Sequence, residues 1–126
     1  MSLEGEHTID TVKQILKNKG IDDPEDMKIN ENYTMESDGY EDLTIEKVGE
    51  DRISVAQTYT QRMDLMRDPE IVYEIEENGD WKPVEYQQDS GIPLYHHDED
   101  GIDIDDFVNE WDENLKKQGF VEASQP

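Results

Sequence analysis

The residues with the clearest potential to bind a metal ion lie in one acidic stretch, residues 96–107. They read His-His-Asp-Glu-Asp-Gly-Ile-Asp-Ile-Asp-Asp-Phe. An EF-hand calcium loop places oxygen ligands at positions 1, 3 and 5, a glycine at position 6 and a bidentate glutamate at position 12. With Gly101 at position 6, the candidate cation ligands are His96, Asp98 and Asp100.

The match to calcium chemistry is incomplete. His96 occupies position 1, where a hard cation prefers a carboxylate, and Phe107 occupies position 12, where glutamate is needed. His96 and His97 are neighbours in an extended segment and point to opposite faces, so they would rarely serve one zinc site together. We therefore expect no cofactor. The two interpretations of the stretch are a divalent-cation site and a solvated acidic turn that caps the next helix.

Other catalytic chemistry has no sequence support. The chain contains no cysteine, which excludes disulfides and thiol nucleophiles. There is no phosphate-cradling glycine loop, no nucleophile elbow and no HExxH pattern. Because 34 residues are acidic, two carboxylates close in sequence carry no information about acid–base catalysis. We expect a protein that is not an enzyme, with a metal-dependent enzyme using residues 96–106 as the alternative.

The charge balance restricts the partners. Lys plus Arg number 11 and Asp plus Glu number 34, so the formal net charge is −23. Such a surface repels phosphates and leaves no basic patch, so direct nucleic-acid binding is not expected. No apolar run approaches about 18 residues, so no membrane span is expected, and without a visible signal peptide the expected location is the cytoplasm. The charge itself is open to three explanations: function, salt adaptation or solubility.

Two polar stretches are poorly explained by folding alone. One covers residues 58–70 and the other residues 87–91, and both leave predicted strands at the same end of the predicted sheet. Their amide, hydroxyl and carboxylate groups line a shared cleft in one interpretation and satisfy only their own loops in the other. A shared site requires the side chains of Asp64 and Asp89 to lie within about 15 Å, several strand spacings. The candidate binding residues are Tyr59, Gln61, Asp64, Asp68, Gln87, Gln88 and Asp89.

A predicted hairpin over residues 71–87 brings these stretches together, with Asn78-Gly79 at its tip. A two-residue type I′ turn needs positive φ at both central positions, and Asn-Gly tolerates this best. The turn places Trp81 on the mainly acidic face, away from the apolar one. The predicted cross-strand pairs are Glu77–Asp80, Ile75–Lys82, Tyr73–Val84 and Ile71–Tyr86.

Alternating apolar residues predict the remaining strands. Residues 43–47 and 53–59 flank a three-residue loop that pairs Ile45 with Val55 and leaves one buried face. Residues 27–35 favour a strand over a helix, and residues 92–95 form a short edge strand because Pro93 cannot donate to a ladder.

Two amphipathic helices are predicted, over residues 9–19 and 104–118. Thr8 and Asp103 are the predicted N-caps, and Gly20 and Gly119 the left-handed residues after the last turns. Residues 1–6 and 122–126 are expected to be disordered. The predicted fold is a single α+β domain, residues 1–126, with a mostly antiparallel sheet of about five strands and an N-terminal and a C-terminal helix packed on it. The predicted apolar stripes are Ile9, Val12, Ile15 and Leu16, and Ile104, Phe107, Val108, Trp111 and Leu115.

A specific order of residues in the second half of the chain carries a family resemblance. It comprises Tyr59, Gln61, the run 64–70, Trp81, Pro83, Gln87-Gln88-Asp89, Trp111, Asn114-Leu115 and Gln118-Gly119-Phe120. Residues 53–120 thereby resemble an uncharacterised bacterial domain family of unknown function, often encoded on plasmids and integrative elements. The resemblance implies no activity, but it gives weight to the candidate patch and suggests a mobile-element or host-interaction role. Arg62-Met63 stands where the family pattern leads us to expect Asn-Gly, so a tight turn there lacks support.

The expected function is therefore binding. We expect a small acidic, non-enzymatic module that engages a protein partner through its acidic surface or through the polar patch. The alternative is an acidic nucleic-acid mimic that occupies a DNA-binding protein. Mimicry requires carboxylates about 7 Å apart, two strand residues of about 3.3 Å each, and Glu74 and Glu76 offer such a step.

Overall fold

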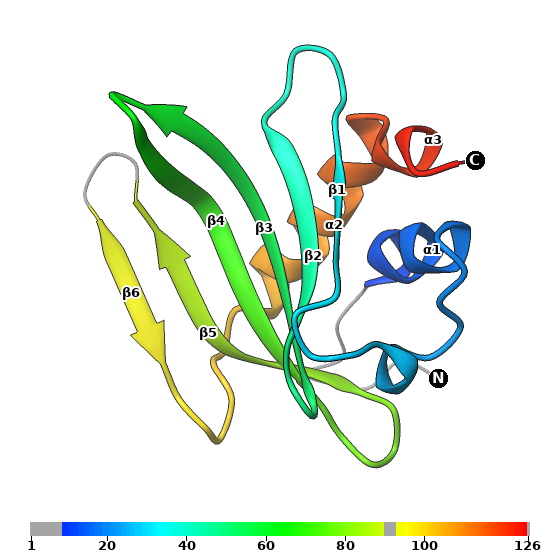
Figure 1. Cartoon of the computed structure of the whole chain (residues 1–126). Helices are drawn as coiled ribbons and strands as arrows, with labels where there is room; N and C mark the ends of the chain where they lie inside the picture. Colours follow the sequence, from blue (N-terminus) through cyan, green and yellow to red (C-terminus); the bar gives the residue numbers. More distant parts are fainter. Residues whose placement is uncertain (1–8, 90–92, 126) are drawn as a thin grey trace.

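The computed structural model describes residues 9–89 and 93–125 and has an α+β architecture (Figure 1). One antiparallel sheet has six strands in the order β1-β2-β3-β4-β5-β6, so every strand pairs with its neighbour in sequence. The sheet has one more strand than the five or so expected, and the predicted helices pack together beside it. The elements are α1 (Asp10–Asn18), a 3₁₀ turn η1 (Pro24–Asp26), β1 (Asn32–Met35), β2 (Asp42–Gly49), β3 (Arg52–Gln61), β4 (Asp64–Ile75), β5 (Trp81–Gln88), β6 (Leu94–His97), α2 (Asp105–Lys117) and α3 (Phe120–Ala123).

The core lies between the sheet and the helices. As predicted, Ile45 pairs with Val55, and the apolar positions of β2 and β3 alternate onto one buried face. Trp111 of α2 belongs to the same core and donates from Nε1 to the Oε1 atom of Gln57 at 2.8 Å. This bond satisfies the one polar atom of a buried indole.

The tip of the β4–β5 hairpin differs from the prediction. Its loop has three residues, because the Glu76 N–H donates to the Asp80 carbonyl at 2.8 Å and the Gly79 N–H donates to the Glu76 carbonyl at 2.8 Å. Gly79 has a φ of 91°, whereas Asn78 is not among the residues with positive φ. The loop is therefore a type I turn with a left-handed glycine and not a type I′ turn.

The longer loop shifts the register by one residue and turns Trp81 inward. A bulge that leaves Val84 unpaired then restores the predicted register further along the strands. Trp81 is 3% exposed, its ring centroid lies 5.5 Å from that of Tyr73, and its predicted place on the acidic face was wrong. The observed pairs are Ile75–Trp81, Glu74–Lys82, Tyr73–Pro83 and Ile71–Tyr86, so only the last of the four predicted pairs is confirmed.

The helices follow their predicted stripes and end at their predicted left-handed glycines, Gly20 and Gly119, but the predicted N-cap of α2 is not found. The Ile21 N–H donates to the Leu16 carbonyl at 2.8 Å after a left-handed Gly20, which confirms the predicted end of α1. Thr8 lies outside the described residues. At α2 the N-cap residue is Ile104 and no side chain caps it, so the prediction for Asp103 was wrong.

The first turn of α1 is capped from another helix. The buried Asp112 carboxylate of α2 accepts hydrogen bonds from the Thr11 N–H at 3.1 Å and the Val12 N–H at 3.4 Å. Burial raises the pKa of Asp112, and the bonds from Thr11 and Val12 oppose that rise. A carboxylate 100 residues away thus replaces a local cap.

The C-terminal segment is anchored further than expected. Residues 120–123 form α3, and the following Ser124 is buried. The Asn18 Nδ2 donates to the Ser124 Oγ at 2.9 Å, which ties this end to α1. Within residues 9–89 and 93–125, none of the helices is both long enough and apolar enough to cross a membrane.

Candidate functional site

The β3–β4 hairpin contains the two longest strands of the sheet, with 10 and 12 residues. The segment predicted as a connection is strand, because β3 continues to Gln61 and β4 begins at Asp64. Arg62 and Met63 form a two-residue turn with φ values of 51° and 72°, so a tight turn is present without Asn-Gly. The two strands pair without interruption from Gln61–Asp64 to Thr58–Arg67. This pairing holds Arg62 and Met63 in their uncommon left-handed conformation.

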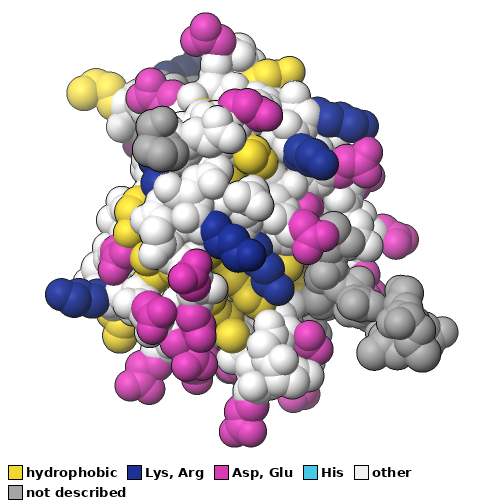
Figure 2. All heavy atoms as spheres, turned by 90° about the vertical axis from the view of Figure 1, so that its right-hand side faces the viewer, with side chains coloured by type: hydrophobic (Ala, Val, Ile, Leu, Met, Phe, Trp, Pro, Cys, Tyr) yellow, Lys and Arg dark blue, Asp and Glu magenta, His cyan; other side chains and the backbone are white. Residues whose placement is uncertain are grey.

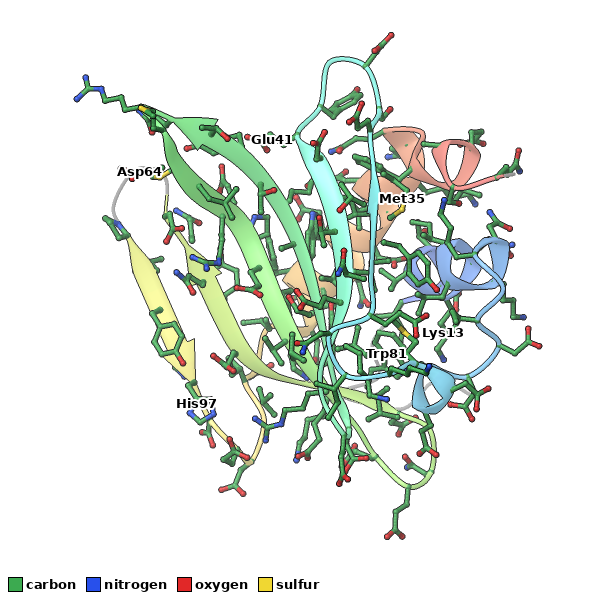
Figure 3. All side chains as sticks on the ribbon, viewed as in Figure 1. Lys13, Met35, Glu41, Asp64, Trp81 and His97 are labelled. Carbon is green, nitrogen blue, oxygen red and sulfur yellow. The ribbon has the colours of Figure 1, made fainter. Side chains whose placement is uncertain are left out.

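We call the region around this tip the distal end of the sheet. It comprises the tip of the β3–β4 hairpin, the start of β2 and the start of β6. Figure 3 shows Glu41 and Asp64 at this end and His97 toward the opposite end of β6. The distal end therefore gathers segments from residues 40, 60 and 94 of the sequence.

Most of the exposed large apolar side chains lie toward the distal end. In the described part of the chain, seven large hydrophobic side chains are exposed. Two of them lie toward the opposite end of the sheet: Ile29 precedes β1, and Val48 lies near the end of β2. Four of the other five lie at the distal end, and the fifth, Tyr95, follows Leu94 in β6. The five are Tyr40 (51% exposed), Met63 (94%), Leu65 (59%), Leu94 (54%) and Tyr95 (63%).

Part of the predicted polar patch is occupied with internal bonds. The Asp89 carboxylate accepts from the Arg67 N–H at 2.9 Å and from Gln87 Nε2 at 3.0 Å. The bond from Gln87 and then the bond from Arg67 lower the pKa of Asp89. The Asp89 N–H also donates to the Arg67 carbonyl at 2.8 Å. Gln87 and Asp89 thus extend the contact between β4 and β5 at the base of the distal hairpin.

The other predicted patch residues lie elsewhere at the same end. Asp64 is exposed beside the turn and pairs with Gln61, three residues from Arg67, or about 10 Å along the strand. Asp64 therefore lies beside the turn, whereas Asp89 lies against Arg67, and the two carboxylates have different surroundings. The Tyr86 hydroxyl donates to Gln88 Oε1 at 2.9 Å. Asp68 lies close enough to raise the pKa of Tyr86, after the larger effect of burial.

A cleft of about 620 Å³ runs beside the distal half of β3. Of the predicted patch residues, only Tyr59 lines this cleft. The sequence analysis did not include the loop before β2 in the site, and the Ser-Asp-Gly turn at residues 37–39 was the only sequence feature that indicated a loop there. Burial and then the nearby Asp68 raise the pKa of Glu41. The main lining residues are Tyr40, Glu41, Asp42, Thr60, Leu65 and Gln118.

The predicted cation ligands do not converge. His96 pairs with Tyr86 and His97 with Glu85, so their side chains lie on opposite faces of β6. His97 Nε2 lies 2.6 Å from Glu99 Oε2, and Asp98 Oδ1 accepts from the Asp100 N–H at 2.9 Å. Among residues 9–89 and 93–125, no group of three or more His, Asp or Glu side chains is placed to hold a metal ion.

The face of the sheet away from the helices carries paired charges. Glu74 accepts from Lys82 at 3.2 Å and from Arg52 at 3.3 Å, and Arg52 also contacts Glu99. The bonds from Lys82 and then Arg52 lower the pKa of Glu74. The acidic row proposed for nucleic-acid mimicry is therefore neutralised at one of its two residues.

Sequence comparison adds a family to this geometry. No curated protein matches the chain at a significant level. No solved structure matches it significantly either. A family model described as a domain of unknown function, DUF6908, matches residues 10–121, from the first turn of α1 to α3, which is a longer span than the resemblance over residues 53–120 indicated. The chain belongs to the DUF6908 family.

Proposed function

We propose that this domain is a small acidic binding module, without catalysis, that engages a protein partner through the distal end of its sheet. The observation that supports this is the pair of exposed apolar side chains, Met63 and Leu65, at the tip of the β3–β4 hairpin. Only 33% of the residues are hydrophobic, so few apolar side chains remain for the surface once the core is filled, and exposed ones call for an explanation. Apolar groups that gather on a surface mark contact sites more often than scattered ones do.

The hairpin backbone supports the same proposal. Arg62 and Met63 occupy left-handed conformations that glycine or asparagine adopts with less strain. Two long side chains are therefore displayed at a turn where local folding would favour small residues, and such outliers concentrate at functional positions. The bonds between Asp89 and Arg67 hold the base of the hairpin, so a partner would meet a preorganised surface.

The alternatives have less support. Mimicry of nucleic acid relied on Glu74 and Glu76, and Glu74 is paired with Lys82 and Arg52. A metal-dependent enzyme needs converging ligands, which the described residues around His96 do not form. The resemblance to domains of plasmids and integrative elements favours a partner encoded by the element or by its host.

Site-specific photocrosslinking tests the proposal. A benzophenone amino acid replaces Met63 in one variant and Val48 in the other; both positions are exposed, and they lie at opposite ends of the sheet. We expect a discrete protein adduct from an extract of the source organism with the probe at Met63 and none with the probe at Val48. Equal adducts at both positions would contradict a directed site.

The captured protein then supports an affinity measurement. Met63→Ser with Leu65→Ser should weaken its binding about 10- to 100-fold, the loss expected for two apolar anchors. The matched control is Ile29→Ser with Val48→Ser, which removes two exposed apolar side chains from the opposite end. Equal affinities of the two double variants would contradict the proposal.

A further inference from the structure

The end of β3, beyond Thr58, has a free edge on the side of β2. In a two-residue hairpin the residues that flank the turn, here Gln61 and Asp64, exchange hydrogen bonds, and the next pair does not. The N–H and C=O of Thr60 therefore point away from β4, toward the side where β2 lies. β2 begins at Asp42, opposite Thr58, so in the described part of the chain no strand faces Thr60 on that side.

The cleft of about 620 Å³ lies along this free edge. Tyr40 and Leu65 contribute exposed apolar surface to it, and Thr60 is itself exposed. A cleft bordered by an open strand edge is suited to an extended peptide, whose backbone continues the ladder and whose alternate side chains enter the cleft.

The charge of the lining identifies the kind of peptide. Glu41 and Asp42 are the charged residues of the cleft, and both are acidic. Asp68 lies near enough to Glu41 to add to the rise that burial causes in the Glu41 pKa. A lysine or arginine beside Glu41 would relieve this repulsion. A second copy of the chain is disfavoured, because its own net charge is −23.

Two basic residues, Arg62 and Arg67, lie at the distal end without lining the cleft, and others lie on the helices. Figure 2 shows Lys and Arg side chains among the acidic ones on the side where α1 and α3 lie. Lys17 lies in the last turn of α1, and Lys116 and Lys117 lie in the last turn of α2, where cations interact favourably with the helix dipoles. None of the described residues that line the cleft is a lysine or an arginine.

We propose that the cleft receives an extended basic segment of the protein partner, which pairs with β3 at Thr60 and places a lysine or arginine side chain beside Glu41 and Asp42. This rests on the proposed function and names the recognition mode of the same distal end. Backbone pairing at Thr60 provides position, and the charge beside Glu41 provides selectivity for basic sequences.

A pair of synthetic peptides tests the charge preference. The probes are blocked octapeptides of alternating lysine and valine or alternating glutamate and valine, followed by amide NMR of the ¹⁵N-labelled domain. The lysine peptide should shift the amide signals of Thr58 and Thr60, slow the hydrogen exchange of Thr60 and bind less tightly as salt is raised. The glutamate peptide should leave these signals unchanged. Absence of Thr60 shifts with the lysine peptide at about 1 mM would overturn the proposal.

A matched pair of proline variants tests the backbone pairing. Thr60→Pro removes the N–H that faces the free edge and leaves the bonds to β4 in place. Thr34→Pro is the control, because the Thr34 N–H also faces a free edge, the outer edge of β1. Lys47 of β2 exchanges backbone hydrogen bonds with Asn30 and Glu31, and alternation along β1 then turns the Thr34 N–H away from β2. We expect Thr60→Pro to weaken binding of the lysine peptide and of the captured partner about 10-fold, and Thr34→Pro to leave both unchanged.

Charge variants complete the test and separate it from the proposed function. Glu41→Gln should weaken binding of the lysine peptide about 3- to 10-fold, whereas Glu50→Gln, exposed in the β2–β3 turn, should have no effect. A partner that needs Met63 and Leu65 but binds Thr60→Pro as tightly as Thr34→Pro overturns the edge pairing and leaves the proposed function standing. If the partner binds the Met63, Leu65, Thr60 and Glu41 variants with unchanged affinity, both proposals are wrong.

Discussion

The two ends of the sheet satisfy their charges in different ways. Away from the β3–β4 tip, Glu74 is paired with Lys82 and Arg52, and its pKa lies below the ordinary value. At the distal end, burial and Asp68 raise the pKa of Glu41. The first arrangement is complete within the chain, whereas the described residues that line the cleft beside Glu41 include no lysine or arginine. A net charge of −23 therefore says less about function than the places where its carboxylates are left uncompensated.

The largest effect is expected in the core, which both ends share. Trp111→Ala should lower the free energy of unfolding by about 3–5 kcal/mol, the range for a buried tryptophan, because it removes the ring and the bond to Gln57. Urea titration measures this loss. Trp111→Phe keeps an aromatic ring and should lose less. A loss well under 1 kcal/mol for alanine would mean that α2 is not docked on the sheet as the structure shows.

The next effect concerns the cap that joins the two helices. Asp112→Ala should cost about 1–3 kcal/mol, because the Thr11 and Val12 N–H groups lose their buried acceptor. Asp112→Asn keeps one carbonyl acceptor and should cost less. Hydrogen exchange of the Thr11 and Val12 amides reports the loss directly. Unchanged exchange in the alanine variant would mean that another group caps α1.

Two acidic residues of the distal end should separate folding from binding. Asp89→Ala should cost about 1 kcal/mol, because Asp89 accepts from Arg67 and Gln87, whereas Asp64→Ala, at an exposed position, should leave the urea midpoint unchanged. The pKa of Asp89 is lowered from its ordinary 3.8, so its contribution is present above that value and is lost as the pH falls through the folded-state pKa. Equal midpoints for the two variants would remove the distinction between them.

The smallest effect has the opposite sign. The folded-state pKa of Glu41 lies above the ordinary 4.5, so its charge destabilises the fold at neutral pH, and this penalty disappears as the pH falls through that pKa. Glu41→Gln should therefore raise the free energy of unfolding at pH 7 by less than about 1 kcal/mol, with a smaller gain near pH 5. Glu50→Gln controls for the general loss of one negative charge. A stability loss in Glu41→Gln that Glu50→Gln does not share would show that the distal end is already compensated.

Some features followed directly from local spacing. The apolar stripe of α1, its left-handed Gly20 and the alternation that pairs Ile45 with Val55 all match the structure. They were predictable because helical and strand periods are properties of neighbouring residues, and a stripe or an alternating face has one orientation that buries it.

Only the tertiary structure decided the features that depend on distant residues. Trp81 enters the core because a three-residue loop moves the register by one, and Asp112 caps α1 from across the helix pair. The Arg62-Met63 turn is held by the strand pairs on both sides of it, and the cleft at Thr60 exists because β2 begins two residues too late to cover it. Local propensities left each of these open, because the deciding free energy lies in the burial of side chains and in hydrogen bonds between segments far apart in the sequence.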